Sequence, residues 1–465
     1  MNDFTSHQAG PKLPKRFLRR SKYFWLSFRH WKRRLLFWTG AICVGIAAVF
    51  FAKGSEQANL LFHRLIAFSP YLPLLVAPAG LALVAYITRR FFPGSQGSGI
   101  PQTIAALQME DSNDRQSVLS LRIALGKIPL TLVGLLSGAS VGREGPTVQI
   151  GAAIMHAIGG FGRYHRLDIE KGLIIAGGAA GVAAAFNTPL AGVVFAIEEM
   201  SRSFEEKTNG IVLTAVIVAG MTSLGMIGNY TYFGYTSAEL DLNNGWIAVL
   251  VCGVVGGLFG GLFSRILIAA ARGIPGRLGS LMKERPIVFA ALCGFALALI
   301  GLLSGSTTYG TGYQEAQQLV SEGIPLPESY GILKMLATIV SYVSGIPGGL
   351  FAPSLAIGAG FGANMVNLMP YAPAGAVVIL GMVSYFAGVV QAPITSFVIV
   401  MEMTDNHAML LPLMAASILA SACSRLICTK PLYKALAESF LQRATAIPAK
   451  PPAETQAAPQ EPLSL

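Results

Sequence analysis

The sequence predicts an all-helical protein that crosses a membrane many times. Of its 465 residues, 53% are hydrophobic and only 12% are charged. A soluble globular protein carries about twice that charged fraction, because it must cover its surface with solvated groups. Several apolar runs also approach or exceed the roughly 20 residues that a helix needs to cross the hydrocarbon core of a bilayer. These observations exclude a large soluble enzyme.

The first 34 residues carry most of the net positive charge. They hold ten of the 34 Lys and Arg residues and one of the 23 Asp and Glu residues, in a chain with a formal net charge of +11. By the positive-inside rule, such a segment ahead of the first apolar run lies in the cytoplasm. We expect 1–34 to be a cytoplasmic polybasic segment along anionic lipid headgroups. Nucleic-acid binding is not expected, because the rest of the chain has no basic stripe.

The apolar runs are of two kinds. The longer ones are spanning candidates, at 35–52, 72–87, 211–229, 245–272 and 286–305. The shorter ones each open at or just before a proline, at 101–109, 146–159, 189–200, 353–369 and 393–403. Proline suits the first turn of a helix, and helices that start inside a membrane must be buried in protein or line a cavity. Broken helices of this kind indicate the binding site of a transporter.

Two motifs recur in the same order along the chain. The segment 142–152 aligns with 349–359, and Pro189 with Glu198 aligns with Pro393 with Glu402. The alternative is that small-residue membrane helices look alike by chance. We interpret the match as a repeat, with halves at about 90–230 and 300–440 inside a membrane domain at 35–440. A cytoplasmic Pro/Ala-rich tail is expected at 441–465, and we expect its last part, 446–465, to be disordered.

Three loops that lead into short helices have the composition of an anion site. An exposed helix N-terminus offers unpaired N–H groups and about half a positive charge, which together bind anions. In each loop glycine permits close backbone approach and proline starts the helix, and only Ser98 adds a hydroxyl donor. The alternative for any one loop is an ordinary re-entrant turn. The loop residues are Gly97, Ser98, Gly99 and Pro101, then Gly142, Arg143, Gly145 and Pro146, then Gly349, Leu350, Phe351 and Pro353.

Glu144 is the acid inside the second loop. A carboxylate there can occupy the same positive pocket as a transported anion when it is ionised, and leave that pocket when it is protonated. The alternative is a surface ion pair between Arg143 and Glu144.

Two further acids end the helix that starts at Pro189. Glu198 has a repeat counterpart in Glu402, which indicates a structural role. Glu199 has none, because Met403 occupies the matching position. The acid that breaks the symmetry is therefore the better candidate for proton transfer.

Lys127 and Tyr433 are the remaining candidates. Lys127 lies in an apolar run and needs a partner or solvent, so we expect a structural or electrostatic role. Tyr433 follows the last apolar region, where a tyrosine at the membrane interface is the default interpretation. The five cysteines have no spacing typical of a metal or redox site. We expect no metal and no cofactor.

These motifs resemble the CLC family of chloride channels and transporters. GSGIP (97–101), GREGP (142–146), GLFAP (349–353) and Tyr433 are similar to its four anion-site elements, and the likeness extends over 35–440. The resemblance implies a homodimer with one pore per subunit, each built from two inverted halves of tilted and broken helices. Regulatory domains of many eukaryotic members have no counterpart after 441, which favours a multi-pass protein of a bacterial inner membrane with both termini cytoplasmic.

The resemblance also implies a role for individual residues. The hydroxyls of Ser98 and Tyr433 and the backbone N–H groups of Leu350 and Phe351 would bind the central chloride. Glu144 would be the gating glutamate and external proton acceptor, and Glu199 the internal proton-transfer glutamate. Ser98 in place of proline implies chloride over nitrate, and the intact Ser98 and Tyr433 elements argue against the fluoride-exporting branch.

We therefore expect a proton-coupled chloride antiporter, with chloride, protons and lipid as its partners and no enzymatic activity. The alternative within the family is a passive voltage- or pH-gated chloride channel. Well-studied bacterial relatives carry acids just after GSGIP, where this sequence has Gln102 and Ile104, and this departure bears on how tightly protons are coupled. An intramembrane enzyme and an organic-solute symporter are rivals, but the sequence shows neither a catalytic set nor substrate-specific polar groups.

Overall fold

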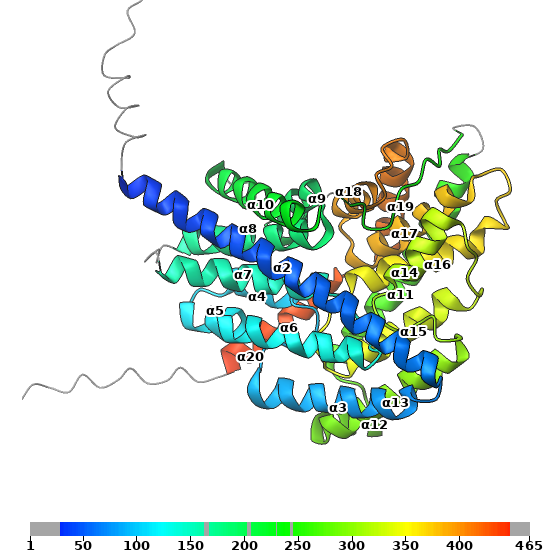
Figure 1. Ribbon diagram of the computed structural model, residues 1–465, viewed down its shortest axis with the longest axis horizontal. Helices are drawn as coiled ribbons and strands as arrows, with labels where there is room; N and C mark the ends of the chain where they lie inside the picture. Colours follow the sequence, from blue (N-terminus) through cyan, green and yellow to red (C-terminus); the bar gives the residue numbers. More distant parts are fainter. Residues whose placement is uncertain (1–27, 162–166, 202–205, 229, 242–244, 447–465) are drawn as a thin grey trace, which may run out of the picture.

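The computed structural model describes residues 28–161, 167–201, 206–228, 230–241 and 245–446. Within these ranges the chain forms helices joined by short loops, and eight helices are long and apolar enough to cross a membrane (Figure 1). The predicted class, an all-helical polytopic membrane protein, is confirmed. Most of the predicted polybasic segment, 1–27, and most of the predicted tail, 447–465, lie outside the described residues.

The first half of the chain contains nine α-helices and one π-helical turn, counted within the described residues up to Ile227. These are α2 (Phe28–Phe68), α3 (Pro73–Phe91), α4 (Ile100–Gln108), α5 (Ser112–Leu119), α6 (Leu121–Leu136), α7 (Glu144–Phe161), α8 (Leu167–Phe186), α9 (Pro189–Phe195), the π-helical η1 (Ala196–Met200) and α10 (Glu206–Ile227), numbered as in Figure 1 from the first described helix. The broken helices predicted at 101–109, 146–159 and 189–200 correspond to α4, α7 and α9 with η1.

The second half repeats this alternation of long and short helices. It contains α11 (Gly245–Arg272), α12 (Arg277–Glu284), α13 (Pro286–Leu303), α14 (Tyr313–Gln317), the π-helical η2 (Gln318–Glu322), α15 (Tyr330–Val343), α16 (Phe351–Val366), α17 (Ala374–Val390), α18 (Pro393–Thr404), α19 (Leu410–Ile427) and α20 (Leu432–Ala446). The short helices predicted at 353–369 and 393–403 are α16 and α18.

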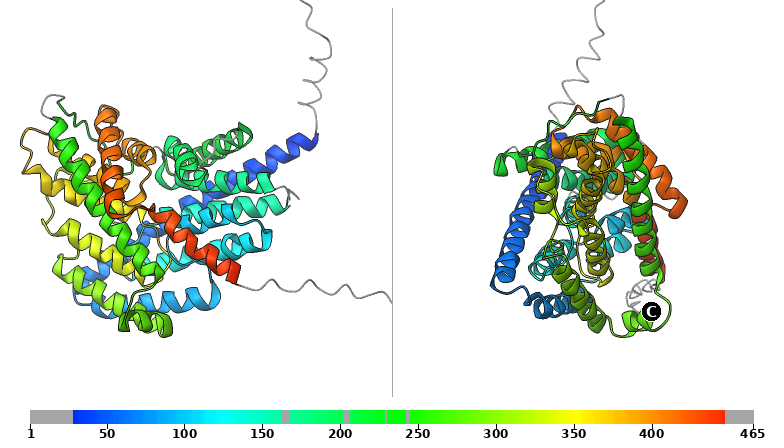
Figure 2. Two further views of the ribbon diagram at one scale, coloured as in Figure 1. Left: turned by 180° about the vertical axis from the view of Figure 1, so that it is seen from behind. Right: turned by 90° about the vertical axis from the view of Figure 1, so that its right-hand side faces the viewer.

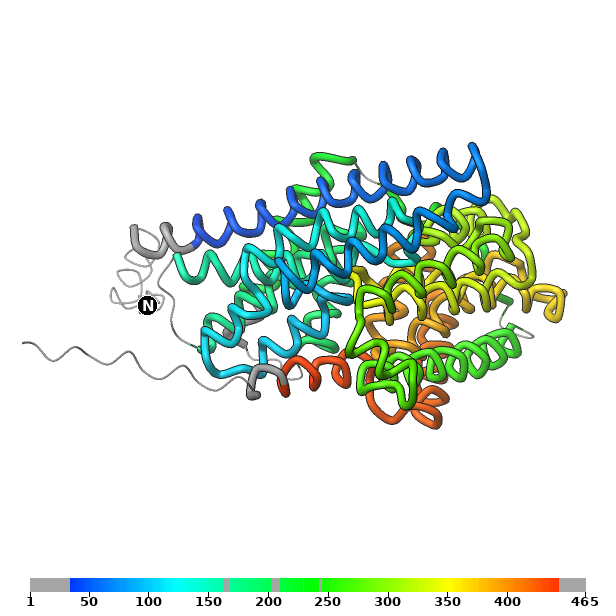
Figure 3. The backbone as a smooth tube through the Cα atoms, turned by 90° about the horizontal axis from the view of Figure 1, so that it is seen from below, coloured from blue at the N-terminus to red at the C-terminus, as the bar shows by residue number. Residues whose placement is uncertain are grey.

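The two halves lie beside each other, and the last helix connects them. Most of α4 to α10 lies on one side of the molecule and most of α14 to α19 on the other (Figures 1 and 3). Figure 2 shows α20 crossing back from the second half to the first, where it contacts α4. The first described helix begins, and the last one ends, at the same side of the molecule (Figures 1 and 3).

The backbone repeats its conformation at the positions that the repeat relates. Asn187 and Gln391 both have φ of 58°, an uncommon left-handed conformation for residues other than glycine. The next residues also match: Thr188 has φ −126° and ψ 81°, and Ala392 has φ −120° and ψ 82°. Each pair stands just before the proline that begins α9 or α18. Equal backbone strain at equivalent positions supports the repeat over chance similarity.

Two repeat-related glycines pair with each other in antiparallel orientation. The Gly142 N–H donates to the Gly349 carbonyl at 2.7 Å, and the Gly349 N–H donates to the Gly142 carbonyl at 2.6 Å. Residues that exchange identical hydrogen bonds in this way are related by a two-fold rotation that reverses the direction of the chain. The two halves are therefore inverted copies that meet at this pair.

Two carboxylates join the halves by the same symmetry. Both Glu198 oxygens accept from α18, from the backbone N–H groups of Ile394 at 3.1 Å and Thr395 at 2.6 Å. Both Glu402 oxygens accept from α9, from Leu190 at 3.1 Å and Ala191 at 2.6 Å. Each carboxylate caps a helix N-terminus of the opposite half, where negative charge is stabilising. This geometry agrees with the structural role predicted for Glu198.

Neutralising either cap is expected to destabilise the fold. We expect Glu198→Gln and Glu402→Gln each to lower stability by about 1–3 kcal/mol, because each loses charge-assisted hydrogen bonds to an otherwise unsatisfied helix end. The measurement is thermal unfolding of the detergent-solubilised protein. Glu438→Gln is the matched control, since its exposed pair with Lys430 contributes little. Equal unfolding temperatures for all three variants would contradict the capping role.

Candidate anion site

Backbone hydrogen bonds hold the three predicted loops side by side. The Gly97 N–H donates to the Ile346 carbonyl at 3.0 Å, and the Gly348 N–H donates to the Gly97 carbonyl at 3.1 Å. The third loop therefore bonds to the first through Gly97 and to the second through the Gly142–Gly349 pair. The starts of α4, α7 and α16 are brought together at one place inside the molecule.

Glycine is required at this junction because the loops touch through their backbones. A methyl group on Gly145 would overlap the Ser98 Oγ and lie 3.2 Å from the Gly349 Cα. A methyl group on Gly99 would lie 2.7 Å from the Gly145 carbonyl oxygen, and Gly99 has φ of 104°. Contacts this close leave no room for a side chain, so the glycines predicted to permit close approach do so here.

Two buried hydroxyls at the junction have no hydrogen-bond partner among the described residues. They are the Ser98 Oγ, with the residue 1% exposed, and the Tyr433 Oη, with the residue 0% exposed. The charges of Glu199 and Glu144 lie close enough to the Tyr433 hydroxyl to act on it electrostatically. Each hydroxyl can donate one hydrogen bond, so the pair offers two donors to an acceptor at the junction. The interface position considered for Tyr433 is wrong, because α20 carries the side chain into the core.

The start of α16 faces the same junction. The helix begins at Phe351 with Leu350 as its N-cap residue, and both are buried. The first N–H groups of a helix have no partner inside that helix, which leaves donors here. The Phe351 ring stacks on Tyr433, with centroids 6.1 Å apart and planes at 10°. This stacking fixes the tyrosine against the helix end.

The Glu144 carboxylate occupies one side of the junction. Glu144 is the first residue of α7 and is 1% exposed, so the alternative of a surface ion pair is wrong. Its Oε1 accepts from the Tyr232 Oη at 2.8 Å. Its Oε2 has no hydrogen-bond partner among the described residues and lies against Gly142, next to Pro353. One carboxylate oxygen is thus held, and the other lies beside the start of α16.

Arg143 does not neutralise Glu144 by a direct hydrogen bond. Its Nε lies 3.8 Å from the Glu144 Oε1, while its Nη1 donates to the Ala52 carbonyl on α2 at 2.7 Å. Its guanidinium also lies over the Tyr232 ring, 5.6 Å from the centroid. The full positive charge is therefore directed away from the junction.

Glu199 is buried on the last turn of the broken helix. That turn, η1, is π-helical, a form that often occurs at functional sites. Glu199 is 3% exposed, whereas Glu198 is only half-buried and reaches α18. The equivalent end of α18 is regular α-helix up to Thr404 and carries Met403. The two neighbouring acids therefore differ in environment as their repeat relations predicted.

A network of buried polar side chains, Lys127, Gln149 and Gln102, lies next to the Ser98 loop. The Lys127 Nζ donates to the Gln149 Oε1 at 2.6 Å, and the Gln149 Nε2 donates to the Val118 carbonyl at 2.7 Å. Gln102 accepts from the Gly99 N–H at 3.0 Å and donates to the Gln96 carbonyl at 2.5 Å. Gln102, which stands where the family pattern has an acid, thus fixes the loop by neutral hydrogen bonds. Ile104, the other departure from that pattern, is buried.

Two residues of this region were not predicted from the sequence. Lys334, at the repeat position of Lys127, is fully buried and donates to the carbonyls of Thr308, Tyr309 and Gly310 at 2.9–3.2 Å. The 207-residue offset between the lysines equals that of the repeat, so the pattern contained this signal. Tyr232 comes from the loop before α11, and nothing in the sequence marked it.

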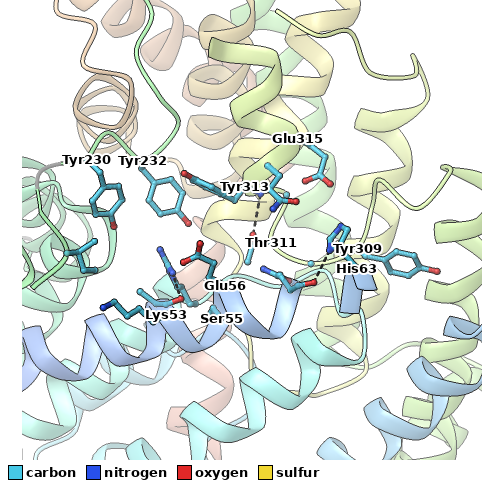
Figure 4. Close-up of a pocket in the computed structure, with 17 residues that line it drawn as sticks. Lys53, Ser55, Glu56, His63, Tyr230, Tyr232, Tyr309, Thr311, Tyr313 and Glu315 are labelled. Carbon is cyan, nitrogen blue, oxygen red and sulfur yellow. Dashed lines mark hydrogen bonds between the residues drawn. The ribbon is translucent and has the colours of Figure 1, made fainter. Parts of the chain in front are cut away.

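Cavities lie on both sides of the junction. One, of about 280 Å³, is lined by Arg143, Tyr232 and residues of α2 and α14. Figure 4 shows Tyr230, Tyr232 and Tyr313 across it from Lys53 and Glu56. The other, of about 400 Å³, is lined by Gln96, Gly97 and Tyr342. Within the described residues no group of His, Cys, Asp and Glu could hold a metal ion. The donors at the junction are hydroxyls and the start of a helix, which are groups that bind anions.

Comparison with known proteins identifies the family. A sequence model of the voltage gated chloride channel family matches residues 80–425, so the chain belongs to that family. The fold is similar to that of a slow cyanobacterial Cl⁻/H⁺ antiporter, with 26% identity, a TM-score of 0.75, and coverage of 88% of this chain and 98% of that one. The class that the fold and the family define is a CLC transporter, and the resemblance of the motifs is confirmed.

Two further structures have the same fold. A CLC-type fluoride/proton antiporter has a TM-score of 0.72 at 24% identity, covering 88% of this chain and 99% of that chain. A eukaryotic CLC transporter has a TM-score of 0.67 at 20% identity, covering 87% and 75% respectively. At these identities the similarity concerns the fold alone.

A single methyl group at Gly145 is expected to disrupt anion binding. In Gly145→Ala the new methyl displaces the Ser98 hydroxyl and the Gly349 backbone, so we expect chloride affinity to fall by about tenfold or more. Isothermal titration calorimetry with chloride measures the loss. Gly160→Ala, on the same helix with open space around it, is the control and should bind as wild type does. Unchanged affinity in Gly145→Ala would show that the ligand binds elsewhere.

Proposed function

We propose that the protein exchanges chloride for protons across a bacterial inner membrane. The observation that carries the proposal is the pair of buried, unpartnered hydroxyls of Ser98 and Tyr433 at the meeting point of helix N-termini. A chloride ion between them would accept both hydroxyl hydrogens. It would also accept from the N–H groups of Leu350 and Phe351, whose helix end contributes partial positive charge.

The charge balance suits an ion that must also leave. Arg143 is bonded to Ala52 and stacked on Tyr232, and Lys127 is bonded to Gln149, so neither ammonium nor guanidinium lies in the site. Dipoles and hydroxyls bind an anion more weakly than a fixed full charge does, and transport requires release as well as binding. Two cavities flanking the junction would provide access from both sides.

Glu144 would couple the anion to a proton. While ionised, its carboxylate competes with an anion for the positive end of α16, beside Gly142 and Pro353. Once protonated, it no longer interacts strongly with that positive end, and the side chain can move toward the cavity lined by Arg143 and Tyr232. An anion can then pass, and return of the carboxylate carries the proton to the site.

Glu199 would exchange protons with the cytosol. It is the buried acid that breaks the repeat symmetry, and the Tyr433 hydroxyl lies within electrostatic reach of both Glu199 and Glu144. A proton passing between the two acids would therefore travel beside the anion site without sharing its path from the cytosol. The position equivalent to Glu199 in the other half is occupied by the apolar residue Met403.

The assembly and topology are part of the same proposal. We infer a homodimer with one pore per subunit, as expected for the family. Apolar side chains equivalent in the two halves, Leu190 and Ile394, are half-exposed beside the reciprocal caps, and this face suits a second copy. Cytoplasmic termini agree with the basic residues before Leu35 and with the start of α2 and the end of α20, which lie on the same side of the molecule. The domain limits 1–34, 35–440 and 441–465 stay predictions, and the described helices α2 and α20 run across the limits at 34 and 440.

The alternative is a passive chloride channel of the same family. The similar cyanobacterial protein is a Cl⁻/H⁺ antiporter, and the buried Glu199 favours the same activity here. The Ser98 loop has Gln102 and Ile104 where the family pattern has acids. The smaller number of acids near this loop bears on how many protons move per chloride. A fluoride/proton antiporter also shares the fold, but the intact Ser98 and Tyr433 elements favour chloride.

Reconstituted protein is expected to pump protons against their gradient when a chloride gradient is applied. We expect wild-type proteoliposomes to show chloride-driven proton movement, measured with a pH electrode alongside a chloride electrode. Glu144→Ala should abolish proton movement and keep chloride flux, because the path loses its acid. Glu199→Gln should abolish proton movement while Glu144 still responds to external pH.

The control is Glu438→Gln, an exposed acid on α20 that should leave both fluxes unchanged. Chloride movement without proton movement in the wild type would replace the antiporter by the passive channel. Competition by an amino acid, rather than by bromide, would indicate an organic-solute symporter.

A further inference from the structure

We propose that Tyr232 is a positioning residue that holds the ionised Glu144 carboxylate in the anion path and thereby sets the pH at which the path opens. This inference rests on the proposed role of Glu144. The Tyr232 Oη donates to the Glu144 Oε1 at 2.8 Å, and both side chains are almost fully buried. A hydrogen bond from a hydroxyl to a carboxylate in a buried environment is strong and directional.

Tyr232 is the side chain that donates directly to this carboxylate. The nearest cation, Arg143, is 3.8 Å away at its Nε, which has no hydrogen-bond partner among the described residues. The second carboxylate oxygen has none either, and it faces Gly142 and Pro353. A neutral phenol thus holds one oxygen, while the other remains where an anion would be stabilised by α16.

The phenol ring has little freedom to follow the carboxylate. It packs edge to face against Phe186, Phe233 and Tyr313, with centroids 4.9–5.4 Å apart. The Arg143 guanidinium covers its face at 5.6 Å. Such aromatic contacts are directional and resist reorientation. The hydroxyl is therefore a fixed donor, and Glu144 must leave it in order to move.

Backbone hydrogen bonds anchor the loop that carries this ring. The Phe233 N–H donates to the Met403 carbonyl on α18 at 3.0 Å, and the Ser321 hydroxyl donates to the Phe233 carbonyl at 2.8 Å. The Asn187 side chain donates to the Tyr230 carbonyl at 3.0 Å. The loop is tied to both halves of the protein, so Tyr232 keeps its place relative to the junction.

The aromatic cluster also reaches the inner hydroxyl. Phe186 contacts Tyr232 on one side and Phe351 on the other, at 5.6 Å, and Phe351 stacks on Tyr433. One set of packed rings therefore sets the positions of both the Tyr232 hydroxyl and the Tyr433 hydroxyl. Tyr232 lies outside the recurring motifs, and this packing holds it in a fixed position relative to Tyr433 and the start of α16.

Several other charged or titratable groups face Glu144 or its cavity. They are Arg143 beside it, Lys53, Glu56 and His63 on α2, Tyr230 on the loop, Tyr313 and Glu315 on α14, and Tyr433 on the inner side. Figure 4 shows the α2 groups across the cavity from the tyrosines. Substituting Tyr232 changes none of these groups, so the effect of its hydroxyl can be isolated.

The hydroxyl favours the ionised state of Glu144. A carboxylate accepts the phenol hydrogen with full negative charge, whereas a protonated carboxyl accepts it only as a weaker neutral group. The bond therefore stabilises the closed, ionised arrangement. Without it, the closed arrangement is less favoured, and we expect the pH at which chloride flux is half-maximal to rise.

The test is the pH dependence of chloride flux in Tyr232→Phe, which keeps the ring and removes only the hydroxyl. We expect the midpoint pH to shift upward by about one unit or more, the size expected for loss of one hydrogen bond to a charged group. Tyr313→Phe is the matched control, since Tyr313 packs on the same ring and should leave the midpoint unchanged. In a Glu144→Ala background, Tyr232→Phe should change nothing.

A second variant tests the opposite direction. 3-Fluorotyrosine at position 232 keeps the shape and makes the hydroxyl a stronger donor, so the midpoint should move downward. A midpoint unchanged in both variants overturns the proposal, as does a shift that persists without Glu144. Thermal unfolding equal to wild type shows that each variant is folded.

The pH midpoint of chloride flux tests the role of Tyr232 separately from the proposal that the protein exchanges chloride for protons. Only chloride flux is measured, so a wild type that moves chloride without protons would reject antiport and leave the midpoint test intact. A pH dependence that is the same in wild type and Glu144→Ala overturns the positioning role, because the carboxylate would then not control the path.

Discussion

Every helix end inside the membrane must find partners for its polar groups, and this requirement organises the whole structure. Water is absent from the hydrocarbon region, so an unpaired N–H or carbonyl there costs several kcal/mol. Here the starts of α9 and α18 receive carboxylates from the opposite half, Glu402 and Glu198. The loops before α7 and α16 bond to each other through Gly142 and Gly349. The donors that this pairing does not use are the Ser98 and Tyr433 hydroxyls and the start of α16, and they surround the site we assign to chloride.

The same requirement decides what each buried charge does. Lys334 is satisfied by three carbonyls and Lys127 by Gln149, so both strengthen loops behind the site rather than bind an ion. Arg143 bonds to α2. Glu144 differs from all of these, because one of its oxygens is held by Tyr232 and the other has no partner among the described residues. A carboxylate held through one oxygen can change its place at modest cost, whereas Lys334 would have to break three hydrogen bonds.

Much of this arrangement was predictable from local sequence. Proline near the start of each short apolar run identified the broken helices to within a few residues, because proline is favoured in the first turn of a helix. The repeat offset matched Glu198 with Glu402 and matched Glu199 with Met403, which is not an acid. Tyr433 could not be placed this way, since its burial depends on α20 crossing back to contact α4 (Figure 2). Tyr232 was missed because its role depends on a loop held by residues far away in the chain.

The sequence by itself determined the membrane class, the broken helices, the repeat and the motifs of the anion site, because each follows from composition or from spacing along the chain. Only the tertiary structure decided which polar groups remain unpaired. That outcome depends on which helix ends face each other, and no local pattern encodes it. The Ser98 and Tyr433 hydroxyls become a site only when the start of α4 and the start of α20, far apart in the sequence, come together. Neither hydroxyl then has a hydrogen-bond partner among the described residues.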